Sequence, residues 1–212
     1  MPVSLNQESL QFGRVILWEV TEDEQFFRDE LALAGHETAL VESMHPKRRK
    51  EWLCGRYLIR QFLDIQPKDV VIDQFGKPQL PSNDTHISIS HSGGKVALAY
   101  ANHLIGLDIQ QTRPGISKLA HKFCTDNDYS WLSEHLDEVD IQHLVWVSKE
   151  AVYKAFGRRM IDFRKDIIIR SCQKTDGRLV LGTDIKNDDL SMSFDVFTRV
   201  WPDMYSAVAV IK

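Results

Sequence analysis

Three residues that could act together in chemistry lie on two separate stretches of the chain, Glu150 and Lys154 on one and Asp108 on the other. Glu150 and Lys154 are four residues apart in a stretch of helical periodicity, so an acid and a base occupy neighbouring turns of one face. Asp108 and Gln110 are two residues apart in a β-rich stretch and share one strand face. Carboxylate and carbonyl oxygens suit Mg²⁺, which keeps water and substrate phosphate as its other ligands. These side chains therefore favour magnesium-assisted phosphoryl transfer.

Each part of this pattern also has a simpler interpretation. Glu150 and Lys154 could be a surface ion pair contributing roughly 0.2–0.5 kcal/mol to the helix. Asp108 could be a carboxylate that accepts hydrogen bonds at a strand end, because burying a carboxylate without a partner is costly. The helix that carries Glu150 is predicted over 143–156 and ends at Gly157. Its apolar face belongs in the core and comprises Leu144, Val145, Val147, Ala151, Val152 and Ala155.

Basic residues form a second candidate site on an earlier helix, which Pro46 begins and which runs to about Leu63. Arg49 and Arg56 lie on one narrow stripe of this helix, together with Leu53 and Arg60. Guanidinium groups bind phosphate oxygens in a bidentate manner, so the stripe could hold a polyphosphate, with Lys77 and His91 binding the remainder. The alternative is a solvated basic face. Before this helix, Thr21 is expected to cap a shorter one that ends at Gly35.

The order of elements predicts an α+β fold with antiparallel strands. Three strands, near 85–90, 96–101 and 104–109, are expected to form a meander. The run Lys165–Ile169 repeats the pattern of Lys68–Ile72 after a long helix, which suggests an internal duplication. We therefore expect two pseudo-symmetric α+β halves, residues 1–103 and 104–212, with the metal site in the second half and a ligand cleft at their interface.

The overall composition limits the class of protein. A chain of 212 residues with 43% hydrophobic residues can bury a substantial core. A net charge of −4 argues against general nucleic-acid binding, and no apolar run is long enough to span a membrane. The three cysteines are scattered without metal-ligand spacing, which is typical of reduced packing residues. Without a recognisable targeting segment at the N-terminus, a cytoplasmic protein is expected.

Four short motifs, taken in order, resemble one known family. They are Gly76-Lys77-Pro78, then Ile89-Ser90-His91-Ser92, then Gly106-Leu107-Asp108-Ile109, and last Trp146-Val147-Ser148-Lys149-Glu150-Ala151-Val152-Tyr153-Lys154. This series resembles the 4′-phosphopantetheinyl transferases of the surfactin-synthetase-activating (Sfp-like) type over about residues 46 to 160. Each motif alone is weak, whereas four in the right order are specific.

The resemblance implies an enzyme that moves the 4′-phosphopantetheine group of coenzyme A to a serine of an apo acyl or peptidyl carrier protein and releases adenosine 3′,5′-bisphosphate. By position, Asp108 and Glu150 would bind Mg²⁺, with Gln110 as a further ligand. Glu150 would also be the base for the carrier serine, and Lys154 would contact the pyrophosphate. Other positions would hold coenzyme A. They are Arg49, Arg56, Lys77, Ser90 and His91.

The sequence departs from the family pattern at two positions. The family commonly has Glu where this chain has Gln110, which offers a neutral carbonyl oxygen and predicts a higher metal requirement. The family's Phe-x-x-x-x-Glu motif ends here at Asp128, which we interpret as a helix-capping residue.

Carrier recognition and catalysis both leave alternatives open. The segment from Gln111 to Lys122 would contact an acidic carrier through its basic residues, or it could be an ordinary solvated loop. The protein as a whole could also be a non-catalytic coenzyme A- or carrier-binding module of the same fold. A different acyltransferase that uses coenzyme A has no motif support. A monomer is expected.

Overall fold

The computed structural model describes residues 5–10, 13–82, 84–187 and 190–212, and its contacts divide the chain into two compact units. Unit 1 comprises residues 1–102 and unit 2 comprises residues 103–212. Helices and antiparallel sheets occur in both, so the predicted α+β class is confirmed. That the units are pseudo-symmetric halves stays a prediction.

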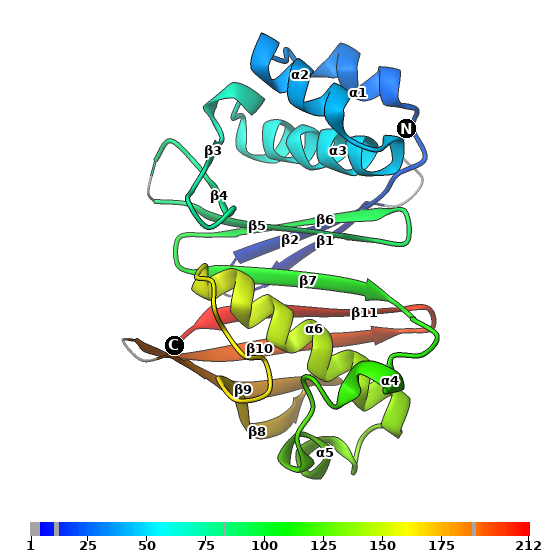
Figure 1. Cartoon of the computed structure of the whole chain (residues 1–212), viewed down its shortest axis with the longest axis vertical. Helices are drawn as coiled ribbons and strands as arrows, with labels where there is room; N and C mark the ends of the chain where they lie inside the picture. The colour runs from blue at the N-terminus through cyan, green and yellow to red at the C-terminus, as the bar shows by residue number, and fades with distance from the viewer. Residues whose placement is uncertain (1–4, 11–12, 83, 188–189) are drawn as a thin grey trace. The chain divides into compact units, whose positions relative to one another are not determined.

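In unit 1 a four-stranded antiparallel sheet, in the order β1-β2-β6-β5, is covered by one long helix, with two shorter helices beyond it (Figure 1). A two-stranded ribbon, β3-β4, follows the long helix. The elements are β1 (Leu5–Leu10), β2 (Gly13–Glu19), α1 (Glu24–Glu30), α2 (Gly35–Ser43), α3 (Pro46–Leu63), a 3₁₀ turn (Pro67–Asp69), β3 (Val71–Ile72), β4 (Pro78–Gln79), β5 (His86–Ser92) and β6 (Lys95–Ala101).

Unit 2 is built on a five-stranded antiparallel sheet, in the order β7-β11-β10-β9-β8, with its longest helix lying across one face (Figure 1). That helix packs against four of the five strands. The elements are β7 (Ile105–Gln111), α4 (Ser117–Ala120), α5 (Asp126–Leu132), α6 (Glu138–Phe156), β8 (Ile167–Thr175), β9 (Arg178–Lys186), β10 (Ser191–Trp201) and β11 (Met204–Ile211).

Helix α3 begins and ends as the sequence predicts, whereas α6 ends as predicted but begins at Glu138, before the predicted start at residue 143. Pro46 occupies the first turn of α3, and Asp64 ends the helix in the left-handed conformation. The Asp137 carboxylate caps α6 by accepting a hydrogen bond from the backbone N–H of Asp140. Gly157 ends α6 with a φ of 67°.

Three expectations about the remaining elements are wrong. Asp23, not Thr21, caps α1, and α1 ends at Glu30, well before Gly35, where α2 begins. Nor do the three consecutive strands form one meander, because β7 pairs with β11. The reason is that β6 already pairs with β5 on one edge and with β2 on the other, so neither edge remains for β7.

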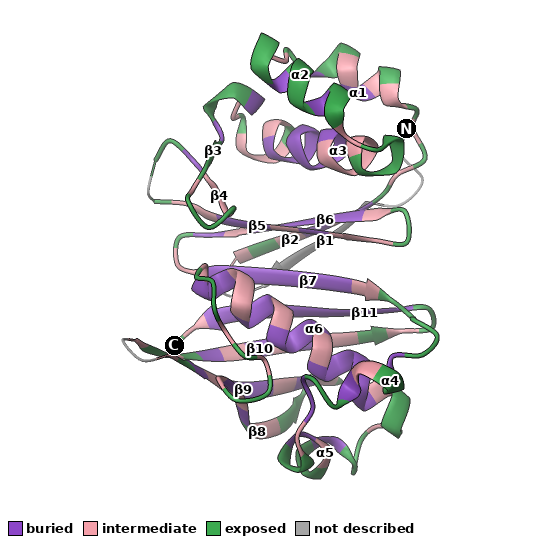
Figure 2. Ribbon diagram, viewed as in Figure 1, coloured by how far each residue is buried: buried purple, intermediate pink, exposed green. Residues whose placement is uncertain are grey.

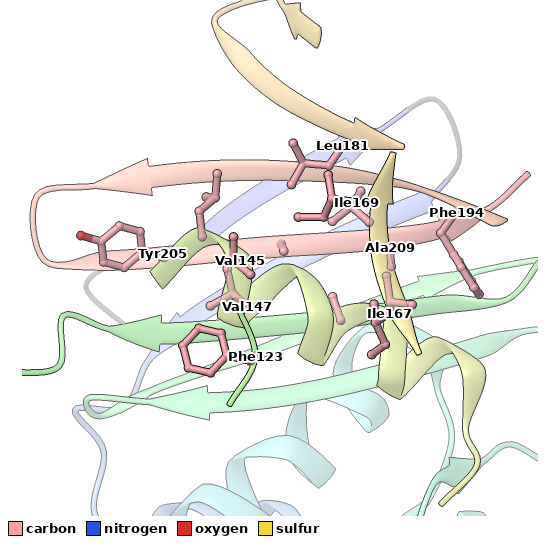
Figure 3. Packing of buried hydrophobic residues seen from close by; sticks show 14 of the residues in the cluster. Phe123, Val145, Val147, Ile167, Ile169, Leu181, Phe194, Tyr205 and Ala209 are labelled. Carbon is pink, nitrogen blue, oxygen red and sulfur yellow. The ribbon is translucent and has the colours of Figure 1, made fainter. Parts of the chain in front are cut away.

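The predicted core face of α6 is confirmed. All six of its apolar residues are buried and belong to the main cluster of unit 2. Figure 3 shows Val145 and Val147 within this cluster, together with Ile169 of β8 and Leu181 of β9. From Ile141 to Phe156 only four residues of α6 are even partly exposed. They are Trp146, Glu150, Tyr153 and Lys154. Figure 2 shows α6 as mostly buried, with a few stretches of intermediate burial.

Helix α6 and strand β7 approach each other closely at Gly106. A Cβ atom added to Gly106 would lie 1.9 Å from the carbonyl oxygen of Ala151, 2.6 Å from the backbone nitrogen of Ala155 and 2.9 Å from its Cβ. Real Cβ atoms do not come so near to backbone atoms, so only glycine allows this packing. The small side chains of Ala151 and Ala155 provide the matching surface on the helix.

Because of this contact, adding one methyl group at position 106 should strongly reduce the stability of the protein. Gly106→Ala should lower the free energy of unfolding by about 3 kcal/mol or more, because the helix backbone must move away from the strand. Gly55→Ala on α3 is the matched control. A Cβ atom there would lie 3.5 Å from the Ile89 side chain, an ordinary contact, and alanine favours a helix. Urea unfolding of both variants checks this, and equal stabilities would contradict it.

Candidate active site

Asp108 of β7 and Lys154 of α6 are joined by a short ion pair. The Lys154 ammonium nitrogen lies 2.6 Å from one oxygen of the Asp108 carboxylate. Asp108 is buried, with 6% of its surface exposed, so its charge needs such a partner. The strand acid and the helical base therefore meet, although they are 46 positions apart in sequence. The sequence analysis expected Asp108 to share Mg²⁺ with Glu150, and that role stays a prediction.

Glu150 lies one turn before Lys154 on the partly exposed stripe of α6. Its pKa is raised from 4.5 to about 7, first because burial disfavours the charged carboxylate and second because the negative charge of Asp108 is near. The positive charge of Lys154 acts in the opposite direction. Two carboxylates and one ammonium group thus share a partly buried site, and at neutral pH Glu150 can either hold or accept a proton.

Gln110, the third predicted metal ligand, lies on the same strand face as Asp108. In the β7–β11 register Gln110 is opposite Tyr205 and Asp108 is opposite Ala207, and both partners belong to the core on the α6 side of the sheet. The Gln110 amide donates a hydrogen bond to the carbonyl oxygen of Gln111 at 3.1 Å. Its role as a metal ligand stays a prediction.

Asp108 and Glu150 offer two carboxylates, a donor set that Mg²⁺ can use. Among the residues described, no three or more His, Cys, Asp or Glu side chains gather as a metal-binding group. Mg²⁺ commonly takes only one or two carboxylates and completes its coordination with water and substrate phosphate. Asp108 and Glu150 are near enough to repel each other, and a divalent cation would relieve that repulsion.

A pocket of about 690 Å³ opens beside Glu150. Its aromatic side is held together by ring contacts, with Trp146 5.1 Å from Phe123 and 5.7 Å from Phe163, and Tyr153 5.4 Å from Phe163, between ring centroids. Such a surface suits the apolar part of a ligand, while Glu150 supplies the polar group. The lining residues are Lys122, Phe123, Trp146, Glu150, Tyr153, Met160, Ile161, Asp162 and Phe163.

Behind the pocket lies a buried ion pair that sequence analysis missed. Lys149 is fully buried, and its ammonium nitrogen lies 3.0 Å from the Asp128 carboxylate and 2.8 Å from the carbonyl oxygen of Phe123. Asp128 does cap α5 in a capping box with Thr125, as predicted. Asp128 also balances the charge of Lys149. Lys149 lies four residues before Tyr153 on α6, but this spacing suggests a buried ion pair only if the burial of Lys149 is already known.

The predicted phosphate-binding arginines on α3 already have protein partners. Arg49 lies 3.4 Å from a carboxylate oxygen of Glu24 and 3.6 Å from one of Glu42, acids of α1 and α2. The guanidinium of Arg56 lies 4.7 Å from the Trp52 ring centroid, and burial lowers its pKa. Since Arg56 is only 6% exposed, the alternative of a solvated basic face is wrong for this residue, whereas Arg49 and Arg60 are partly exposed. A role of both arginines in binding phosphate stays a prediction.

The other predicted residues of unit 1 lie along β5 and near β4. His91 is 3.0 Å from the Glu51 carboxylate and also contacts the guanidinium of Arg48, so two residues of α3 that sequence analysis missed hold its ring. Arg48 and Glu51 are three residues apart on one helix face, which is the signal that could have found them. Ser90 is buried, and burial lowers the pKa of Lys77.

Comparison with known proteins identifies the family. The family model described as the 4′-phosphopantetheinyl transferase superfamily matches residues 104–206, and the model of the 4′-phosphopantetheinyl transferase N-terminal domain matches residues 36–101. The chain belongs to the 4′-phosphopantetheinyl transferase superfamily. Asp108, Glu150 and Lys154 all lie within the first of these matches, and Arg49 and His91 lie within the second.

Curated relatives carry the same family name. The transferase gsp of Aneurinibacillus migulanus is 31% identical over 130 residues, which are 58% of this chain and 54% of that protein. Sfp of Bacillus subtilis strain 168 is 36% identical over 123 residues, and ffp of Bacillus subtilis is 38% identical over 123 residues. Each of these two alignments covers 54% of this chain and 55% of the relative. The chain thus aligns with about half the length of the curated relatives it matches.

The raised pKa of Glu150 makes the stability of this transferase-family protein depend on pH. The folded state keeps the Glu150 proton up to about pH 7, whereas the unfolded state releases it near pH 4.5, so wild-type stability falls across this window. Glu150→Gln cannot lose a proton there. In metal-free buffer its stability relative to wild type should rise by up to about 3 kcal/mol between pH 5 and pH 8. Urea unfolding at both pH values measures this, and a pH-independent difference would contradict it.

Proposed function

We propose that this protein transfers the 4′-phosphopantetheine group of coenzyme A to a serine hydroxyl of an apo acyl or peptidyl carrier protein. The meeting of Asp108, Glu150 and Lys154 on β7 and α6, inside the region that the superfamily model matches, carries this proposal.

The chemistry is a displacement at phosphorus. The serine oxygen forms a bond to the phosphorus atom that bears the pantetheine arm, and the bond from that phosphorus to the bridging oxygen breaks. Adenosine 3′,5′-bisphosphate leaves with the bonding electrons. The serine proton passes to the Glu150 carboxylate, directly or through a water, and a pKa near 7 suits a base that works at neutral pH. Lys154 would place its positive charge against the pyrophosphate.

Magnesium is assigned to the two carboxylates of this site. Asp108 of β7 and Glu150 of α6 would hold the ion, with Gln110 of β7 as a further ligand. When bound, the ion would neutralise charge on the pyrophosphate. Lys154 neutralises part of the Asp108 charge.

The family motifs indicate which further residues would bind coenzyme A and the carrier. Arg49, Arg56, Lys77, Ser90 and His91 would hold the phosphates and adenine of coenzyme A. The aromatic pocket next to Glu150 is a suitable place for the apolar part of the transferred arm. The exposed basic segment before α5 would contact an acidic carrier. A monomeric state and a cytoplasmic location stay predictions. Among the described residues no helix is long and apolar enough to cross a membrane.

Transfer can be tested with the whole protein, coenzyme A, Mg²⁺ and an apo carrier, with the mass of the carrier as the measurement. A phosphopantetheine adduct is expected. Binding of coenzyme A without an adduct would support the alternative of a non-catalytic binding module, and acylation from acyl-coenzyme A would indicate a different acyltransferase.

Removing either carboxylate should abolish transfer without unfolding the protein. Asp108→Ala and Glu150→Ala remove charge that the reaction needs, and loss of the base alone lowers kcat by about 10²- to 10⁴-fold. Asp184→Asn is the matched control, because this acid of β9 contacts Arg170 and Ser193 on the sheet and is not a site residue. Normal turnover by either alanine variant would refute the assignment.

Gln110 gives a separate prediction about the metal. Gln110→Glu adds a carboxylate on the strand face that carries Asp108, so the Mg²⁺ concentration for half-maximal rate should fall. Gln111→Glu adds the same charge one position along the strand, where side chains alternate to the other face, and should leave the requirement unchanged. A magnesium titration of the two variants decides this, and equal requirements would mean that position 110 does not face the ion.

A further inference from the structure

Residues 112–122 follow β7, include the short helix α4 and lead towards α5. Side chains of α6 form hydrogen bonds with this segment. Its first anchor is His143, whose side chain is completely buried. The Nε2 atom of His143 accepts a hydrogen bond from the backbone N–H of Arg113 at 2.9 Å. The other ring nitrogen, Nδ1, lies 2.8 Å from the carbonyl oxygen of Val139, to which it must donate. Both ring nitrogens are therefore in use, and they fix one neutral tautomer.

The orientation of the His143 ring is fixed from the sheet side as well. The ring stacks on Tyr205 of β11, with centroids 4.4 Å apart and ring planes inclined by 9°. The Tyr205 hydroxyl donates a hydrogen bond to the Asp140 carboxylate at 2.5 Å, which holds that ring in turn. Strand β11, helix α6 and the 112–122 segment are thus joined at one buried point.

Two further residues of α6 hold the rest of the segment. Gln142, 2% exposed, accepts a hydrogen bond from the Ser117 hydroxyl at 2.7 Å. Its amide donates to Tyr129 and to Glu138, each at 3.1 Å, so its own position is fixed. At the far end, Lys149 donates to the carbonyl oxygen of Phe123. The helix that carries Glu150 therefore also sets the path of the segment, at residues 113 and 117 and at residue 123 directly after it.

The segment leads from the strand of Asp108 to the pocket of Glu150. It begins directly after β7, and its last residue, Lys122, lines the pocket together with Phe123 and Glu150. Arg113, Lys118 and Lys122 are exposed along it, and residues 111–122 contain no acid. An acidic surface of a protein substrate would be attracted to this stretch and brought beside Glu150.

We propose that His143 is a positioning residue for the protein acceptor. By accepting the Arg113 N–H it holds the start of the basic segment, and so determines where the acceptor lies relative to Glu150. This inference rests on the proposed transfer function. His143 touches neither substrate in this role, because it is buried behind the segment and acts through it.

The test compares two replacements of His143 in the complete protein. His143→Phe keeps an aromatic ring against Tyr205 but has no acceptor for the Arg113 N–H, whereas the side-chain carbonyl of His143→Gln can accept it. With His143→Phe, the KM for the apo carrier should rise about three- to tenfold, the effect of one lost hydrogen bond. The KM for coenzyme A and the kcat should both stay within about twofold of the wild-type values. His143→Gln should restore most of the carrier KM.

Two other variants separate positioning from general destabilisation. Thr198→Val removes a buried hydrogen bond to the carbonyl oxygen of Leu179, at the β9–β10 side of the sheet, and should leave the carrier KM unchanged. Ser117→Ala cuts the second anchor from an exposed position of the segment, where loss of folding is not expected. It should raise the carrier KM in the same direction as His143→Phe, and it provides the test if His143→Phe does not fold.

Hydrogen exchange and trypsin cleavage report on the segment independently of activity. The Arg113 amide should exchange faster in His143→Phe than in wild type, and trypsin should cut faster after Lys118 and Lys122, whereas Thr198→Val should show neither change. A loosened segment with an unchanged carrier KM, or an equal rise in both KM values, would overturn the positioning role. If wild-type protein modifies no apo carrier, the proposed function fails, and the exchange data alone decide whether His143 anchors the segment.

Discussion

The close packing of α6 on β7 at Gly106 is the contact on which the candidate site depends. Backbone meets backbone there, because Gly106 has no side chain and Ala151 and Ala155 have the smallest ones available to the helix. Two residues further along the same strand face, the short side chain of Asp108 can therefore reach the ammonium group of Lys154. A larger residue at 106 would push the backbone of α6 away from β7, and with it the Lys154 side chain. The short distance between Asp108 and Lys154 thus depends on the absence of a Cβ atom at Gly106.

Helix α6 combines a structural and a chemical role by its pattern of burial. Between Ile141 and Phe156 it is buried on all sides except for one stripe, and that stripe carries Glu150 and Lys154. The same helix also buries polar side chains, notably Gln142, His143 and Lys149, each of which has hydrogen-bond partners. Buried polar groups of this kind add little net stability, but they specify one arrangement because any other leaves them unpaired. Here they fix the segment that borders the Glu150 pocket.

Charges in unit 1 are balanced within the protein to a greater degree than the sequence suggests. Acids of α1 and α2 surround Arg49, an aromatic ring covers Arg56, and Glu51 and Arg48 hold His91. Pre-positioned side chains lose less entropy when they bind an anion, although each anion must compete with an existing partner. A glutamate that pairs with a basic residue can therefore orient that residue for a phosphate as well as neutralise it.

The sequence by itself determined the two long helices, the apolar face of α6, the α+β class and the family, and it singled out Asp108, Glu150 and Lys154 as candidates for one site. Periodicity and capping involve residues at most a few positions apart, so α3 and α6 can be read locally. Only the tertiary structure decided that β7 joins β11, that Lys149 pairs with Asp128 and that His143 holds Arg113. These contacts join residues 21 to about 100 positions apart, and their energies depend on burial, which no local pattern encodes.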